Sequence, residues 1–150
     1  MHKRFTQFTL LITRISRSIR RLKTDEMKKW GLKSHHVSCL YYLYCSKSLT
    51  ATELCEMCGE DKSALSRAIE ALENEGYIDC NIKAQKRYRS PLVLTEKGME
   101  AGKRIYDRVD QVYKEASEGI SEEDRRILYS CLDKICLKLE EMGDNNGNKE

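Results

Sequence analysis

Apolar and polar positions follow a helical period over much of this sequence. Between residues 61 and 76 the apolar side chains recur every three or four positions, which places them on one face of a helix. Asp61 is suited to cap the start of this helix, and Gly76 is suited to end it. The predicted buried face carries Leu65, Ala68, Ile69 and Leu72. The predicted exposed face carries Ser63, Arg67, Glu70 and Asn74, with Ser66 at its flank.

A shorter helix is predicted immediately before this one. Thr50 and Glu53 form a capping box, in which each side chain accepts a hydrogen bond from the other residue's free backbone amide. The helix that starts here is expected to end at Cys58, and Gly59 then provides the turn into the next helix. Residues 50–76 therefore predict a helix-turn-helix.

Further helices are expected on either side of this motif. Ser34 is placed to cap one that runs through Ser46, Thr95 caps a long one that ends near residue 117, and Ser121 opens the last. The stripe expected to be buried in the first of these helices is Val37, Leu40, Tyr41 and Tyr44. In the second it is Ile105, Val109, Val112 and Ala116.

Both ends of the chain carry seams of apolar residues spaced alternately three and four positions apart. The first seam is Phe5, Phe8, Ile12, Ile15, Ile19 and Leu22. The second is Leu128, Leu132, Ile135, Leu139 and Met142. Such heptad spacing requires a partner surface. Antiparallel packing between two subunits or packing within one chain would bury both seams, and the first arrangement is favoured.

Two short strands with a basic segment between them follow the helix-turn-helix. Residues 77–82 and 91–94 have strand character, and no acidic residue occurs from 81 to 95. The bases of this segment are Lys83, Lys86, Arg87 and Arg89. Unpaired bases at a hairpin tip suit phosphates or a narrow minor groove, where arginine is attracted by the negative potential. This order of elements is that of a winged helix: a helix, a glycine, a strand, a basic tip and a second strand.

Composition and charge narrow the class of protein. The 150 residues are 40% hydrophobic and 34% charged, which is typical of a soluble single domain. The net charge is only +3, but residues 1–29 carry nine Lys and Arg against two acidic residues, and residues 116–150 carry nine Asp and Glu against five Lys and Arg. This asymmetry favours contact with an anionic partner on one surface. The fold class expected is mainly α with a small antiparallel β-hairpin.

The central motifs resemble those of the multiple-antibiotic-resistance regulator (MarR) family. The matching segments are DKSALSR at 61–67, LENEGYI at 72–78, KRYRS at 86–90 and LTEKG at 94–98. The resemblance implies a homodimeric transcriptional regulator, more often a repressor than an activator, that binds a pseudo-palindromic operator in double-stranded DNA. It divides the chain into dimerisation helices at 1–30 and 118–142, a winged helix-turn-helix at 34–98, a connecting helix at 96–117 and a flexible tail at 143–150.

Candidate DNA contacts lie on the helix at 61–76 and at the wing. Ser63, Ser66 and Arg67 are expected at base edges or adjacent phosphates, and Lys62 on a phosphate. Arg87 is expected in the minor groove, with Lys86 and Arg89 on the backbone. The family usually carries an aspartate two positions before this wing arginine, where this chain has Gln85. We therefore expect a more mobile wing.

The family resemblance also implies an effector site between the dimer helices and the winged domain. Its members often bind small aromatic or lipophilic molecules there. The candidate lining residues are His36, Tyr41, Tyr44 and Tyr106. The tyrosines could equally be core residues, and for a histidine at this helix start a solvated position is favoured over a binding role.

Cysteine chemistry is a further alternative. Seven cysteines, an odd number, indicate reduced thiols in a cytosol. Cys55 and Cys58 form a Cys-x-x-Cys pair that could hold zinc or exchange electrons, but no second pair follows, so core packing is favoured. Peroxide-sensing members of the family use a cysteine in the first helix, and none precedes Cys39 here. A thiol- or metal-responsive regulator is kept as an alternative.

No catalytic motif, cofactor-binding loop or metal-ligand set stands out, so we expect no enzyme, cofactor or resident metal. We expect neither a secretory signal nor a membrane span, and the predicted location is the cytoplasm. Two alternatives remain: a protein-interaction winged helix whose basic tip is incidental, and an N-terminal amphipathic helix lying on a membrane surface. The acid-free first 24 residues also resemble a transit peptide, but the heptad seam gives them a structural use.

Overall fold

The computed structural model describes residues 2–28, 31–79 and 91–147 as six helices and a small three-stranded sheet. The elements in chain order are α1 (His2–Met27), α2 (Ser34–Ser46), β1 (Ser48–Leu49), α3 (Ala51–Cys58), α4 (Lys62–Asn74), β2 (Ile78–Asp79), β3 (Leu92–Leu94), α5 (Glu96–Ala116) and α6 (Glu122–Gly147). The mainly α class with a small antiparallel sheet is confirmed. Residues 1–110 and 111–150 form two compact units. None of the described helices is long and apolar enough to cross a membrane.

The predicted caps fix where the helix-turn-helix starts and turns. The Thr50 hydroxyl accepts a hydrogen bond from the Glu53 amide at 3.3 Å, and the Glu53 carboxylate accepts one from the Thr50 amide at 2.7 Å. Asp61 caps α4 by accepting from the Ala64 amide at 2.8 Å. Between the two helices Gly59 adopts a left-handed φ of 63°, which disfavours a side chain. Both helix starts are therefore set by local sequence.

The sheet has the order β1-β3-β2, and both pairings are antiparallel. Ser48 pairs with Val93, and Ile78 pairs with Leu94. The sequence predicted β2 and β3 but not β1. A strand of two residues has too little pattern to be seen in a sequence, and its pairing with β3 is a tertiary contact. Together the three strands form the described base of the wing.

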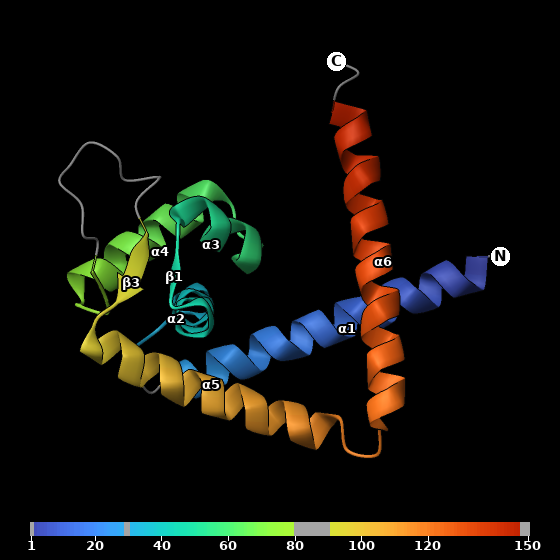
Figure 1. The fold of residues 1–150 in the computed structure, drawn as a ribbon, viewed down its shortest axis with the longest axis horizontal. Helices are drawn as coiled ribbons and strands as arrows, with labels where there is room; N and C mark the ends of the chain where they lie inside the picture. Colours follow the sequence, from blue (N-terminus) through green and yellow to red (C-terminus); the bar gives the residue numbers. More distant parts are fainter. Residues whose placement is uncertain (1, 29–30, 80–90, 148–150) are drawn as a thin grey trace. The chain divides into compact units, whose positions relative to one another are not determined.

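The core of the first unit lies around α2 (Figure 1). Four of its side chains are completely or almost completely buried, namely Val37, Cys39, Leu40 and Leu43. The predicted inner face of α4 is confirmed, because Leu65, Ala68 and Leu72 are buried and Ile69 packs against them. Burial of α4 on this face leaves its other face exposed.

The start of α5 is tied to the end of α4 and the first residues of the wing. The Thr95 amide donates to the Tyr77 carbonyl at 3.0 Å, and the Thr95 hydroxyl donates to the Gly76 carbonyl at 2.7 Å. The same hydroxyl accepts from the Gly98 amide at 3.1 Å, as the predicted cap requires. Lys97 lies over the Tyr77 ring, with Nζ 4.0 Å from its centroid. This junction couples the position of the wing base to the long helix.

Apolar seams are exposed on both terminal helices in the single chain. On α1 the exposed apolar side chains are Leu10, Leu11, Ile12, Ile15, Ile19 and Leu22. On α6 they are Ile127, Leu128, Ile135, Leu137, Leu139 and Met142. Helix α6 also continues to Gly147, so residues 143–147 are helical rather than part of the tail predicted from 143 onward. The polar, glycine-rich composition of this segment therefore predicted the C-terminal end of α6 too early.

Candidate nucleic-acid interface

The exposed face of α4 presents the predicted contact residues together on its first two turns. Lys62, Ser63, Ser66 and Arg67 are all exposed. The Arg67 guanidinium donates from Nε to the Ser63 carbonyl at 3.3 Å, a hydrogen bond that does not use its two terminal nitrogens. In the described part of the chain neither Lys62 nor Arg67 forms an ion pair.

The charges along α4 give this face a direction. The basic side chains lie in the first half, whereas Glu70 and Glu73 lie in the second and Glu75 follows as the C-cap. A helix N-terminus also carries a partial positive charge from its unpaired amides. The N-terminal half of α4 is therefore suited to approach phosphates, and the C-terminal half would be repelled by them.

The turn before α4 holds this end of the helix in place. The Gly59 amide donates to the carbonyls of Cys55 at 3.0 Å and Glu56 at 3.3 Å, which closes α3. The Cys55 thiol donates to the Glu60 carbonyl at 3.0 Å, so it also binds the turn. As a result the N-cap of α4 is fixed relative to α3 by a small number of identifiable contacts.

The predicted wing contacts lie outside the described residues. Lys86, Arg87, Arg89 and Gln85 all fall within 80–90, so their roles stay predictions. The base of the wing is described, because β2 and β3 pair with each other and Tyr77 joins the hydrophobic core.

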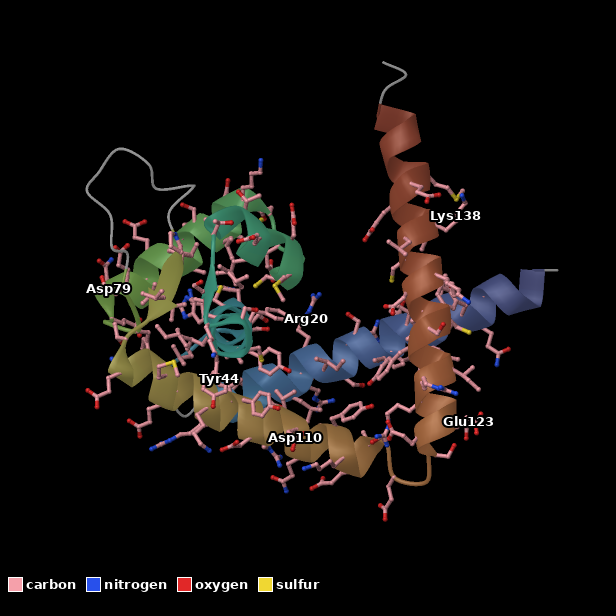
Figure 2. All side chains as sticks on the ribbon, in the orientation of Figure 1. Arg20, Tyr44, Asp79, Asp110, Glu123 and Lys138 are labelled. Atoms are coloured by element: carbon pink, nitrogen blue, oxygen red, sulfur yellow. The ribbon has the colours of Figure 1, made fainter. Side chains whose placement is uncertain are left out.

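Three predicted effector residues come together where α2 meets α5. The Tyr41 and Tyr106 rings are stacked with their centroids 6.2 Å apart, and the centroids of Tyr44 and Tyr106 are 5.6 Å apart. Figure 2 shows Tyr44 on α2 beside α5, an approach that Gly102 permits because a Cβ there would lie 2.8 Å from the Tyr44 Cβ. Burial raises the pKa of Tyr41 to about 12, so its phenol stays protonated at neutral pH.

The fourth predicted residue, His36, lies elsewhere on α2 and is buried rather than solvated. Its Nδ1 accepts a hydrogen bond from the Lys33 amide at 3.4 Å, and its ring meets that of His35 edge-on. Burial, with the neighbouring His35 charge, lowers the pKa of His36. Lys33 is thus the N-cap residue in place of Ser34, and His36 closes that cap. The prediction of a solvated helix start was wrong because an imidazole can satisfy an amide as a Glu side chain does.

The Cys-x-x-Cys pair lies at the end of α3, with both side chains packed against the core. This packing agrees with the structural interpretation favoured by the sequence. Within the described residues no group of three His, Cys, Asp or Glu side chains is arranged to hold a metal ion.

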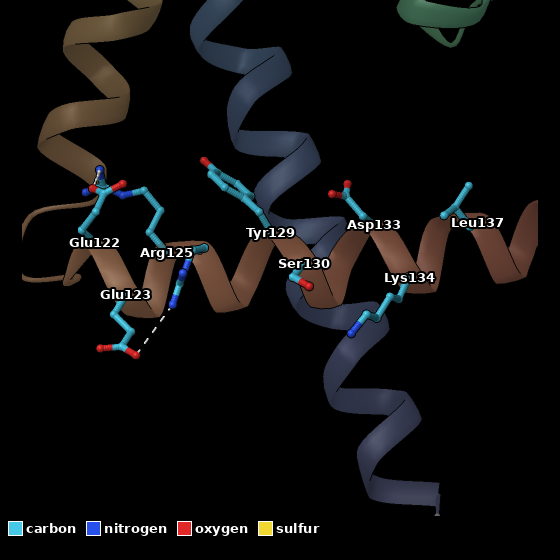
Figure 3. Close-up of a pocket in the computed structure, with 9 residues that line it drawn as sticks. Glu122, Glu123, Arg125, Tyr129, Ser130, Asp133, Lys134 and Leu137 are labelled. Carbon is cyan, nitrogen blue, oxygen red and sulfur yellow. Dashed lines mark hydrogen bonds and ion pairs between the residues drawn. The ribbon is translucent and has the colours of Figure 1, made fainter.

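A groove that sequence reasoning did not find runs along α6 in the second unit (Figure 3). Its volume is about 840 Å³. Its lining residues are Glu122, Glu123, Arg125, Arg126, Tyr129, Ser130, Asp133, Lys134 and Leu137. Arg125 pairs with Glu122 at 2.9 Å and lies over the Tyr113 ring, and the Tyr129 hydroxyl donates to that of Tyr113. Because a single helix lines it, the groove is an open surface and not an enclosed ligand site.

Comparison with known proteins places this geometry in context. Residues 36–113 match the model of the winged helix DNA-binding domain family. An uncharacterised HTH-type transcriptional regulator from Bacillus cereus is 26% identical over 129 residues, which cover 84% of each chain.

Solved structures of MarR-family proteins share the fold. A MarR-family regulator from Listeria monocytogenes, solved with a 26mer DNA, aligns with a TM-score of 0.78 and 22% identity over 93% of this chain and 94% of that one. MepR from S. aureus, in its DNA-binding conformation, aligns with a TM-score of 0.78 and 19% identity over 88% of this chain and 98% of that one. These similar proteins are transcriptional regulators and not enzymes.

Proposed function

Because this chain belongs to the winged helix DNA-binding family and is a DNA-binding transcriptional regulator with the MarR fold, we propose that it binds its operator as a homodimer. In this proposal it represses transcription in the cytosol and responds to a small effector. The observation that carries the proposal is the exposed, basic N-terminal half of α4.

The side chains of α4 divide into two kinds of contact. Arg67 is the only one with a planar fork of donors, which suits a bidentate contact to a guanine edge. Ser63 and Ser66 are short and flank it, so they reach a base edge or an adjacent phosphate. Lys62 stands beside the N-terminus of the helix, where it contacts the phosphate backbone. A helix with this distribution enters the major groove by its first turns.

Dimerisation supplies the second half of the interface. The exposed seams of α1 and α6 are apolar surfaces that need a cover, and a second copy of the chain covers both of them antiparallel. Residues 1–30 and 118–142 are the dimerisation segments, and 34–98 is the DNA-binding segment. A two-fold axis then presents two copies of α4 to one side of the duplex, so the operator is a pseudo-palindrome with half-sites about one helical turn apart.

The wing flanks each half-site in this arrangement. Arg87 lies in the minor groove, where A·T-rich sequence strengthens the attraction, and Lys86 and Arg89 lie along the backbone. Arg87→Ala should weaken binding broadly and reduce the salt slope by about one unit for each phosphate that the wing no longer neutralises. Gln85→Asp should tighten binding modestly by holding the wing arginine. If neither change alters affinity over a salt series, the wing does not engage DNA.

The effector in this proposal binds at the tyrosine cluster of α2 and α5. Tyr41 and Tyr44 are half-buried and Tyr106 is exposed, so their rings offer an apolar surface with hydroxyls at its edge. An aromatic or lipophilic molecule suits such a surface.

Selection of bound sequences from a random duplex library tests the proposal as a whole. The expected result is enrichment of a pseudo-palindrome whose affinity falls steeply with salt, because each phosphate contact releases counterions. A protein-interaction winged helix would give no enriched sequence and a shallow salt dependence. Sedimentation of the complex should show two chains on each duplex.

A further inference from the structure

Helix α1 carries a line of arginines on the side opposite its apolar seam. Arg14, Arg17 and Arg21 follow one another at intervals of three and four positions, so at about 100° per residue they lie within a sector of about 60°. All three side chains are exposed. The seam residues Ile15 and Ile19 lie on the other side of the helix. Helix α1 therefore has two surfaces, the apolar seam and a basic face formed by these three arginines.

The charge of this basic face is largely unneutralised within the described part of the chain. Neither Arg14 nor Arg17 forms an ion pair with a described side chain. Arg21 lies 3.9 Å from the Asp25 carboxylate, which also pairs with Lys28 at 3.3 Å. Such an exposed, long ion pair contributes little. No acidic residue precedes Asp25 in the sequence, so the basic face remains available to an anionic partner.

The acidic helix of a second copy is a poor match for the basic face. Helix α6 holds most of the acidic residues near the C-terminus, but three of its glutamates already pair with basic side chains one turn away in the same helix, namely Glu122, Glu123 and Glu141. A second copy that covers the apolar seam also lies on the other side of α1. The basic face therefore stays exposed in the proposed dimer.

We propose that the basic face of α1 binds the phosphate backbone of duplex DNA, as a contact surface separate from α4 and without sequence preference. Guanidinium groups stay charged and form bidentate hydrogen bonds with phosphate. The rise along the helix from Arg14 to Arg21 is about 10.5 Å, and the phosphates of one DNA strand recur about every 3.4 Å along its axis. The three arginines therefore match about three phosphates. An anionic membrane is a weaker match, because a helix on a lipid surface must also bury the seam that the dimer covers.

The size of the effect follows from counterion release. Each neutralised phosphate contributes about 0.9 to the slope of log affinity against log salt concentration. Three arginines in each of two chains therefore account for about five units of slope, or about three units if one chain of the dimer engages. Phosphate contacts carry no sequence information, so their loss should lower the affinity for operator and for scrambled DNA by the same factor, at least about tenfold at low salt. The preference for the operator should not change.

The test compares two full-length variants that each lose three positive charges. The arginine variant carries Arg14→Gln, Arg17→Gln and Arg21→Gln. Glutamine has a high helix propensity, so α1 should stay folded. The matched control removes three exposed basic side chains that pair with neighbouring carboxylates, and it carries Lys103→Gln, Arg104→Gln and Arg126→Gln.

Sedimentation first establishes that both variants are dimers. Their affinities for the selected operator and for a scrambled duplex of the same length are then measured over a salt series. The arginine variant should show the lower affinity and the shallower slope on both duplexes. The control should bind both duplexes as the parent does.

Each other outcome overturns the inference. If the arginine variant binds both duplexes as the control does, the basic face is only solvated. A loss confined to the operator would assign the arginines to sequence recognition. If the arginine variant keeps its affinity for DNA but no longer binds vesicles of anionic phospholipid that retain the parent, the partner is a membrane.

Two further measurements keep the inference testable. If the arginine variant does not dimerise, Arg17→Gln alone should reduce the slope by about two units for the dimer, and an unchanged slope would overturn the inference. The inference rests on DNA binding by this chain, but its failure is distinguishable from failure of the proposed operator. If selection enriches no sequence, the slope on scrambled DNA still decides whether the basic face binds phosphate.

Discussion

Replacement of Gly98 by alanine should destabilise the junction between α5 and the base of the wing. Gly98 lies in the first turn of α5 and is buried against Tyr77 and Leu94. A Cβ built on it overlaps the Tyr77 carbonyl oxygen and lies 3.2 Å from the Leu94 Cβ. The obstructing atoms belong mainly to backbone, which cannot rotate away as a flexible side chain would.

The magnitude can be worked from the contacts that must give way. Forcing a methyl group into a packed site costs about 1–3 kcal/mol. The Tyr77 carbonyl accepts a hydrogen bond from the Thr95 amide at 3.0 Å, and breaking it costs about 1 kcal/mol. Alanine recovers about 1 kcal/mol over glycine in a helix. The expected net decrease in the free energy of unfolding is about 2 kcal/mol.

Urea unfolding followed by circular dichroism measures this decrease, with protein concentration held constant because dimerisation would otherwise shift the midpoint. Gly143→Ala is the matched control. Gly143 also lies in a helix, but nothing is within 4 Å of its Cβ position, so this change should be neutral or stabilising by up to about 1 kcal/mol. A Gly98→Ala protein as stable as its parent would refute the steric reasoning.

Three further results are expected. Deletion of residues 1–24 removes the seam of α1 and should leave a monomer in sedimentation velocity; a well-folded dimer would show that the seam packs elsewhere. Thr50→Ala removes the cap of α3 and should cost about 1 kcal/mol in urea unfolding, so an unchanged midpoint would contradict the cap. His36 has a lowered pKa through burial, so the unfolded chain binds its proton more readily. The contribution of neutral His36 to stability is complete above about pH 6.5 and is lost as the pH falls through the folded-state pKa. The urea midpoint of the parent should therefore decrease as the pH falls over this range, and His36→Gln should make that decrease smaller.

Local chemistry explains what could be predicted from the sequence. The capping box at Thr50, the Asp61 cap and the Gly59 turn depend on residues a few positions apart, so their pattern is visible in the chain itself. The buried and exposed faces of α4 follow from the helical spacing of its apolar residues alone. These features were confirmed with boundaries correct within a residue or two.

Contacts between residues that are distant in the sequence explain the features that could not be predicted from it. Strand β1 exists because Ser48 and Leu49 meet β3, more than 40 residues away in the chain. His36 is buried because the core covers it, and no local signal distinguishes it from the half-buried His35. In each case the sequence shows the side chain but not the element that packs against it.

The affinity of Arg67→Ala for the selected operator tests the central claim most directly. Arg67 lies on the exposed face of α4, away from the core, so the variant should fold as the parent does. Arg104→Ala is a matched control, since Arg104 is exposed on α5 and pairs there with Glu100. The account predicts that Arg67→Ala weakens binding by about 1–3 kcal/mol, concentrated at one base pair of each half-site, while Arg104→Ala binds as the parent does. Equal affinity of Arg67→Ala and the parent at the same salt concentration would contradict it.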